Sequence, residues 1–260
     1  MSQITVDHSL CRKDGVCVDV CPARILARNP DGFPEPVAPE RCILCGHCVA
    51  VCPSGAIQIA ELPYDQFLPV AKERPSPALI DGFLNSRRSV RVFKDQPVSR
   101  PVIEDLLDVA RRAPTASNSQ QLSWIVVEGK EKMHTLAQTV VDGMRAAGAS
   151  AVLLDRWDRG YDFVLRGAPT LIVACAPEEY SWRKEDAAIA LTYLELAAEA
   201  RKIGVCWAGY LTRFASLYEP LHQLLRVPEG QAVCGALMLG KGTYVYRRIP
   251  PRNPLRVQWN

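Results

Sequence analysis

Residues 78–240 alternate between segments with a helical period of apolar residues and short runs of continuous apolar residues. The period is clear in residues 101–113, behind Ser99 as a candidate N-cap, and in residues 184–204, with Gly204 as a candidate C-cap. The predicted helices are 78–87, 101–113, 131–144, 184–204 and 219–227, the predicted strands are 123–129, 167–177 and 231–240, and residues 205–210 predict a short strand or a loop. Strands separated by helices indicate an α/β or α+β domain.

The segments that flank this region have a different pattern. Residues 61–77, ELPYDQFLPVAKERPSP, contain four prolines and no period, which predicts an ordered linker. Residues 242–260 contain too many prolines to continue a core element, so we expect this tail to wrap around another surface. The expected parts are a small domain at 1–62, a linker at 63–77 and a larger domain at 78–260.

The small domain contains an internal repeat. Residues 11–22, CRKDGVCVDVCP, recur thirty-one positions later as CILCGHCVAVCP, with seven of twelve positions identical. Asp14 stands in the first copy where the second copy has Cys45. Seven of the ten cysteines lie between residues 11 and 52 in C-x2-C-type groups, which is the spacing of metal ligands rather than of disulfides.

The second copy predicts an iron-sulfur site. Its cysteines follow one another with two, two and three residues between them and end in Cys52-Pro53, whereas a zinc ribbon, the alternative, uses two separated C-x2-C pairs. Residues 3–62 resemble a two-cluster bacterial ferredoxin. The resemblance implies crossed ligand sets, in which Cys21, Cys42, Cys45 and Cys48 bind one cluster and Cys11, Cys17 and Cys52 bind the other, with Asp14 in the fourth position.

Asp14 leaves the second of these clusters one thiolate short. A carboxylate is a harder ligand than a thiolate, so the iron at this position is expected to be the labile one. The site then holds either an Asp14-ligated [4Fe-4S] cluster or a [3Fe-4S] cluster with Asp14 unbound, and some ferredoxins show the same substitution. The alternative is that Asp14 is only a turn residue before Gly15. His47, between two ligands, is expected to be exposed.

Three motifs of the larger domain carry a second resemblance. NSRRSVRVF places arginines and a hydroxyl at a helix end, where they suit a phosphate group. RRAPTASNSQQLSW forms a small polar loop between a helix and a strand, and GVCWAGY follows the long helix. Each motif is weak alone, but in this order and spacing residues 78–260 resemble the FMN-dependent nitroreductase family.

That resemblance implies an α+β sandwich that forms a homodimer with two FMN sites at the subunit interface. The positions that match the family's phosphate and flavin-edge contacts are Arg87, Ser89 and Arg91, with Arg88 beside them. Those that match the loop reaching the flavin of the other subunit are Pro114, Thr115, Ala116 and Asn118. Those that match the backbone at flavin N5 and the tail phosphate contact are Ala208, Gly209, Arg252 and Arg248. No catalytic acid or base is predicted.

Charge and composition exclude other classes. The net charge is +3, with −2 in residues 1–62 and +5 in the remainder, and no dense basic patch indicates nucleic acid. No apolar run is long enough to cross a membrane, and the N-terminus lacks the features of a leader, so we expect a cytoplasmic protein.

The predicted function is that of an iron-sulfur flavoprotein oxidoreductase. Clusters pass single electrons and FMN collects two, so electrons from an external donor, a ferredoxin or NAD(P)H, would reach FMN and reduce a small nitroaromatic, quinone or enone. Several family members carry a glutamate at the position of Ala208 that helps to place nicotinamide, which makes NAD(P)H a less secure donor here. The alternatives are reductive dehalogenation or flavin breakdown, favoured by a polar lid within residues 143–166, and electron relay to a protein partner.

Overall fold

A computed structural model describes residues 3–260 and divides the chain into two compact units. The first unit comprises the residues up to Arg74 together with Ala116–Ser119, and the second comprises Pro75–Thr115 and Gln120–Asn260. The first has one small apolar core, whereas the second has two.

The first unit follows the internal repeat. It contains strands β1 Ile4–Val6, β2 Leu26–Arg28, β3 Pro34–Pro36 and β4 Ile57–Ile59, helices α1 Val16–Asp19 and α2 His47–Val51, and the 3-10 turns η1 Pro39–Arg41 and η2 Tyr64–Gln66. Strand β1 pairs antiparallel with β4, and β2 pairs antiparallel with β3. Both short helices follow a left-handed glycine, Gly15 with φ 75° and Gly46 with φ 70°, a conformation that other residues adopt at a cost. The repeat in sequence is therefore a repeat in structure.

A four-stranded antiparallel sheet forms the centre of the second unit. Its strands are β5 Ser123–Glu128, β6 Thr170–Pro177, β7 Gly204–Trp207 and β8 Gln231–Gly240, in the order β5-β6-β8-β7. Its helices are α3 Pro77–Ser86, α4 Arg100–Ala110, α5 Lys130–Ala146, α6 Ala151–Asp158, α7 Arg183–Ala200, α8 Gly209–Ala215 and α9 Glu219–Leu225. The short turn η3, Ala116–Asn118, lies in the segment that belongs to the first unit.

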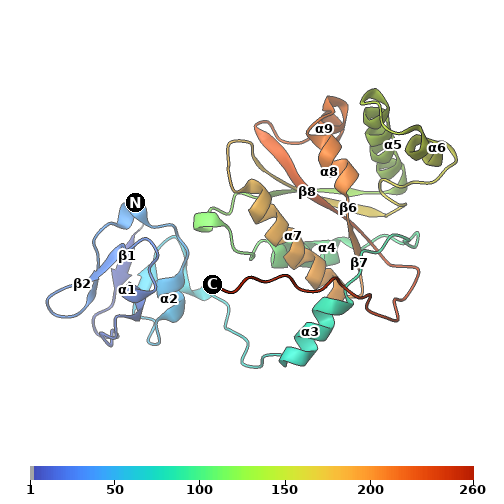
Figure 1. The fold of residues 1–260 in the computed structure, drawn as a ribbon. Helices are drawn as coiled ribbons and strands as arrows, with labels where there is room; N and C mark the ends of the chain where they lie inside the picture. The colour runs from blue at the N-terminus through green and yellow to red at the C-terminus, as the bar shows by residue number, and fades with distance from the viewer. Residues whose placement is uncertain (1–2) are drawn as a thin grey trace. The chain divides into compact units, whose positions relative to one another are not determined.

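Helices cover both faces of this sheet (Figure 1). Alternate residues of β6 belong to different cores, because successive side chains of a strand point to opposite faces. Leu171 and Val173 pack with α5, α8 and α9, while Ile172 and Ala174 pack with α4 and α7. The second unit is therefore an α+β sandwich, which confirms the predicted fold class.

The predicted strands and helices are present, with differences at their ends. Ser99 is the N-cap of α4, as expected, although its side chain makes no capping hydrogen bond. Helix α7 ends at Ala200, so the prediction that Gly204 is its C-cap is wrong. Gly204 instead begins β7, where a Cβ atom would lie 2.7 Å from Val90 Cγ2. Close approach of a neighbouring segment, rather than helix capping, requires glycine there.

The sequence pattern left residues 143–166 ambiguous and predicted that the tail wraps around another surface. Residues 143–166 contain the end of α5, all of α6 and a loop. The tail after Gly240 forms neither helix nor strand and is exposed along most of its length, including Leu255 and Trp259. Within residues 3–260, no helix combines the length and apolar character that crossing a bilayer requires.

Replacing Leu171 by alanine tests the sandwich core. Leu171 of β6 is fully buried against the helices of one face of the sheet. The cavity that alanine would leave should lower the free energy of unfolding by about 2–5 kcal/mol. Leu217→Ala is the matched control, because Leu217 is 67% exposed. Thermal unfolding followed by circular dichroism should show a lower midpoint for the first variant alone, and equal midpoints would contradict this packing.

Candidate functional site

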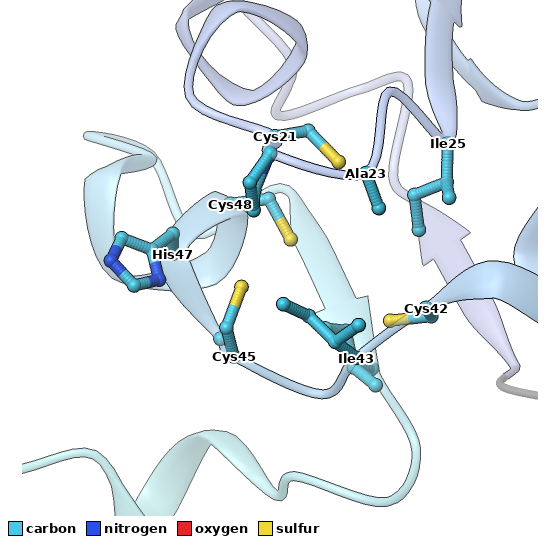
Figure 2. Close-up of a pocket in the computed structure, with 11 residues that line it drawn as sticks. Cys21, Ala23, Ile25, Cys42, Ile43, Cys45, His47 and Cys48 are labelled. Atoms are coloured by element: carbon cyan, nitrogen blue, oxygen red, sulfur yellow. The ribbon is translucent and has the colours of Figure 1, made fainter. Parts of the chain in front are cut away.

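Four cysteine side chains of the first unit surround one cavity (Figure 2). These are Cys21, Cys42, Cys45 and Cys48. Figure 2 shows their sulfur atoms directed into the same space, while the imidazole of His47 is directed away from it. His47 is exposed, as expected. Ile25 and Ile59 contribute apolar walls, and the space free of atoms measures about 310 Å³, including the mouth of the cavity.

A second cavity of the first unit takes the remaining predicted ligands. It is lined by Cys11, Asp14, Cys17 and Cys52 and has the same free space, about 310 Å³. The two cavities thus divide the eight residues into the two sets that the ferredoxin resemblance implies. Among residues 3–260, no three Cys, His, Asp or Glu side chains converge as the ligands of a single ion; the eight residues instead surround two hollows.

Asp14 has contacts that agree with both hypotheses for it. Its Oδ1 accepts a hydrogen bond from Val16 N at 3.2 Å, as a turn residue does. The same residue nevertheless lines the cavity beside three thiols. Its carbonyl oxygen is bound by Arg28 Nη2 at 2.9 Å, and Arg28 Nη1 binds Lys13 O at 3.0 Å. The loop that carries Asp14 is therefore held by one guanidinium group, whichever hypothesis applies.

The thiols of both cavities have the chemistry that iron-sulfur ligation requires. Burial raises the pKa of Cys48 to about 11 and also raises the pKa of Cys17, so these groups hold their protons until a metal displaces them. Burial also acts to raise the pKa of Cys52, but hydrogen bonds from Ser54 and the Ala56 backbone outweigh it and lower the value. Ala56 N lies 3.3 Å from Cys52 Sγ. Soft donors around a hollow, with an N–H group directed at one sulfur, fit a cluster.

In the second unit, Arg87 forms a partly buried ion pair. It is the C-cap of α3, and its Nη1 lies 2.8 Å from Glu195 Oε1 of α7. The Glu195 side chain is only 8% exposed. Burial raises the pKa of Glu195, whereas Arg87 and a hydrogen bond with Trp207 act to lower it. The predicted phosphate arginine is therefore already oriented by a buried carboxylate.

A cavity of mixed character opens where β7 meets α8. Its lining includes the cations Arg91, Arg166 and Arg213 and the aromatic residues Phe163, Trp207 and Tyr210. The rings of Phe163 and Tyr210 meet edge to face at 5.5 Å. Cys206 also lines it, and burial raises the pKa of that thiol although Arg91 and Arg166 oppose the shift. Cations and aromatic rings on one wall suit a planar ligand that carries negative charge.

Asp162 shapes one wall of this cavity. Its Oδ1 accepts hydrogen bonds from Val164 N and Leu165 N at 2.9 and 2.8 Å, and its Oδ2 accepts one from Gly167 N at 2.9 Å. One carboxylate thereby holds the loop that presents Phe163 and Arg166.

Ala208 and Gly209 lie at the junction of β7 and α8. Ala208 is fully buried, and its N–H donates to Ala236 O at 2.9 Å. Gly209 lines the cavity, and a Cβ atom at this position would meet nothing within 4 Å. The backbone here is open to a flat ligand, as the predicted flavin contact requires.

The other predicted flavin residues do not line this cavity. Arg88 donates to Ser86 O at 3.2 Å and to Asn85 O, so it completes the end of α3. Ser89 pairs with Val205, and its carbonyl oxygen accepts a hydrogen bond from Tyr246 Oη at 3.4 Å. Of the predicted flavin residues, only Arg91 and Gly209 line the cavity; those outside its lining also include Arg87, Pro114, Thr115, Ala116, Asn118, Ala208, Arg248 and Arg252.

Several residues near this cavity were missed by the sequence analysis. Glu195 occupies a buried position of α7 between Leu191 and Ala198, and a charged residue at an apolar position of a helical period was the available signal. Arg166 and Phe163 belong to the region that the pattern left ambiguous, and no local signal identified them.

Comparisons with known proteins separate the chain in the same way. Residues 84–241 match the model of the nitroreductase family, and residues 3–53 match a 4Fe-4S dicluster domain. A ferredoxin of Hydrogenibacillus schlegelii, named "Ferredoxin 7Fe", is 37% identical over 57 residues, which are 22% of this chain and 70% of that protein.

Two further similarities concern the second unit. The 4-nitrobenzoate reductase of Pseudomonas putida is 26% identical over 195 residues, covering 62% of this chain and 84% of that protein. The crystal structure of a nitroreductase with bound FMN from Desulfitobacterium hafniense has a TM-score of 0.58 and 26% identity, covering 68% of this chain and 96% of that one.

Glu195→Gln should change how stability depends on pH. The raised pKa of Glu195 means that its contribution to stability is fully present below the usual value of 4.5 and is lost as the pH rises through the folded-state value. The neutral amide has no such loss, so the unfolding midpoint of the variant, relative to that of the wild type, should rise as the pH rises above the usual value of 4.5. Glu185→Gln, which removes an exposed carboxylate from the same helix, controls for the loss of one charge. A midpoint of the variant, relative to that of the wild type, that stays constant or falls as the pH rises would contradict the expectation.

Proposed function

Because the chain belongs to the nitroreductase family, we propose that it is an iron-sulfur flavoprotein whose FMN reduces an electron-poor small molecule such as a nitroaromatic, quinone or enone. Electrons come through the clusters of the first unit or from NAD(P)H, in a ping-pong sequence. When bound, FMN supplies the step that collects two electrons and delivers a hydride equivalent. The working form is a homodimer, as the family resemblance implies.

One observation carries this proposal: the eight predicted ligands line two cavities in their crossed sets, in the same chain as a nitroreductase domain. A nitroreductase that needed only NAD(P)H would have no use for two one-electron centres. Iron-sulfur clusters that transfer single electrons to a flavin allow the flavin to carry out a two-electron reduction.

The chain's own residues then have separate tasks. Thiolates of the first unit bind iron, and the Ala56 N–H is directed at one of them. In the second unit Arg91, Arg166 and Arg213 attract a cofactor with a phosphate group, while Gly209 leaves room for its flat ring. Asp162 holds the loop that carries Arg166. Glu195 orients Arg87 toward the cofactor phosphate.

We further propose that the site with Asp14 holds a cluster with one labile iron. The relative named "Ferredoxin 7Fe" supports this, because seven irons are one fewer than two [4Fe-4S] clusters contain. A carboxylate binds iron in a sulfur site less tightly than a thiolate does.

Replacing Asp14 by cysteine tests this assignment. Mild oxidation of the wild-type protein should produce a [3Fe-4S] signal from one cluster only, measured by electron paramagnetic resonance. Asp14→Cys adds a thiolate to the labile iron, so the signal should disappear and the iron content should rise. If the oxidised wild type shows no three-iron species, and the variant changes neither iron content nor potential, Asp14 is a turn residue only.

Removing Arg87 tests the flavin site. Arg87→Ala alone would leave the buried Glu195 carboxylate without its cation, so Arg87→Ala/Glu195→Gln is the cleaner variant. It should bind FMN about tenfold more weakly or worse, through the loss of charge-assisted contacts to phosphate. Flavin absorbance after dialysis measures this, with Arg100→Ala, an exposed arginine, as the control. Full FMN retention in the double variant would refute the assignment, and the iron-sulfur absorbance should be unchanged in all variants.

A further inference from the structure

The segment Ala116–Ser119 belongs to the first unit, although the residues before and after it belong to the second. Gln120 N donates to Thr115 Oγ1 at 3.1 Å and so closes the base of this segment. Ser117 and Asn118 are both left-handed, with φ 51° and 54°. Asparagine adopts that conformation more readily than most residues do.

Asn118 binds the loop between two cluster ligands. Its Nδ2 donates to Ile43 O at 3.1 Å and to Leu44 O at 3.0 Å. The amide nitrogen carries two N–H donors, enough for both carbonyl groups. Ile43 and Leu44 are the only residues between Cys42 and Cys45, and Leu44 is left-handed with φ 51°. A single side chain therefore holds the short loop that presents two of the four thiols.

In the other half of the repeat, the ligand loop is bound by a different residue. Lys13 corresponds to Leu44 and is also left-handed, with φ 58°. Its carbonyl oxygen and that of Asp14 are bound by the two terminal nitrogens of Arg28. The position thirty-one residues after Arg28 is Ile59, which has no donor. In the all-cysteine half, the donor comes from Asn118, a residue outside the repeat.

We propose that Asn118 is a positioning residue of the all-cysteine cluster, supplying from a distant part of the chain the two-donor contact that Arg28 supplies to the other ligand loop. The inference rests on the proposed function in one respect, because it takes the cavity of Cys21, Cys42, Cys45 and Cys48 as an iron-sulfur site. It gives Asn118 a task that the family resemblance does not, since the side-chain N–H groups bind the ligand loop. Thr115, three residues earlier, remains in the predicted flavin loop.

Asn118→Asp is the sharpest test, because it keeps the size and the left-handed preference but replaces the donor with an oxygen that faces two carbonyl groups. In the full-length protein with its clusters, iron from the all-cysteine cluster should pass to a chelator about tenfold faster. The reduction potential of this cluster, followed by electron paramagnetic resonance, should shift, and that of the cluster beside Asp14 should not. Asn118→Gly, which also tolerates the left-handed backbone and introduces no repulsion, should give a smaller change in the same direction.

Two further variants complete the experiment. Arg28→Met should have the reciprocal effect, faster iron loss from the cluster beside Asp14 only. Asn29→Asp makes the same substitution in the first unit, where the side chain bonds Glu35 rather than a ligand loop, and should leave the all-cysteine cluster unchanged.

Each other outcome overturns the inference. If Asn118→Asp and Asn118→Gly lose FMN while iron release and potential stay as in the wild type, Asn118 serves the flavin and not the cluster. Unchanged iron release, potential and FMN content in both variants would show that the two hydrogen bonds have no role at the cluster. A wild-type protein without a cluster at these four cysteines would overturn the proposed function as well, which distinguishes the two failures.

Discussion

The first unit depends on the left-handed backbone of its two ligand loops. Lys13 and Leu44 adopt it at one position of the repeat, and Gly15 and Gly46 adopt it two residues later. Such residues reverse the direction of a short chain segment, so that ligands two or three residues apart can face one hollow. For a residue with a Cβ atom the conformation costs about 1–2 kcal/mol. Hydrogen bonds to the carbonyl groups of these loops offset that cost, which is why the donors are as important as the thiols.

The two halves of the repeat have diverged at the ligands and at their support. Asp14 replaces a thiol in one half, and Ile59 replaces the supporting arginine in the other. The half with the weaker ligand keeps an internal support, whereas the all-cysteine half is supported by a residue seventy-five positions downstream in the chain. The two halves of the repeat therefore form two sites that differ in their ligand residues and in the source of their hydrogen bonds.

In the second unit, the sandwich determines where a cofactor can bind. Both faces of the sheet are filled by apolar residues from the helices, so polar groups gather where β7 ends and α8 begins. There a buried carboxylate, Glu195, is tolerated because Arg87 and Trp207 satisfy it. Breaking such a pair is costly, while the intact pair holds a cation in a defined direction. The apolar core excludes charged groups, and the buried carboxylate of Glu195 therefore fixes the direction of the Arg87 guanidinium.

The sequence by itself determined the features that depend on neighbours along the chain. Cysteine spacing predicted an iron-sulfur site, and apolar periods predicted the helices and strands that form the α+β sandwich, because these patterns repeat within a few residues. The two crossed ligand sets were implied by the resemblance to a two-cluster ferredoxin. Gly204 was misinterpreted because glycine is required there by the close approach of Val90, which lies more than one hundred positions away in the chain. Other contacts leave no periodic pattern in the sequence. These are the Arg87–Glu195 pair, whose members are 108 residues apart, the loop held by Asp162, and the contact of Asn118 with Ile43 and Leu44. Only the tertiary structure decided them, since the partners of a buried charge or of a loop carbonyl are chosen by the packing of distant segments.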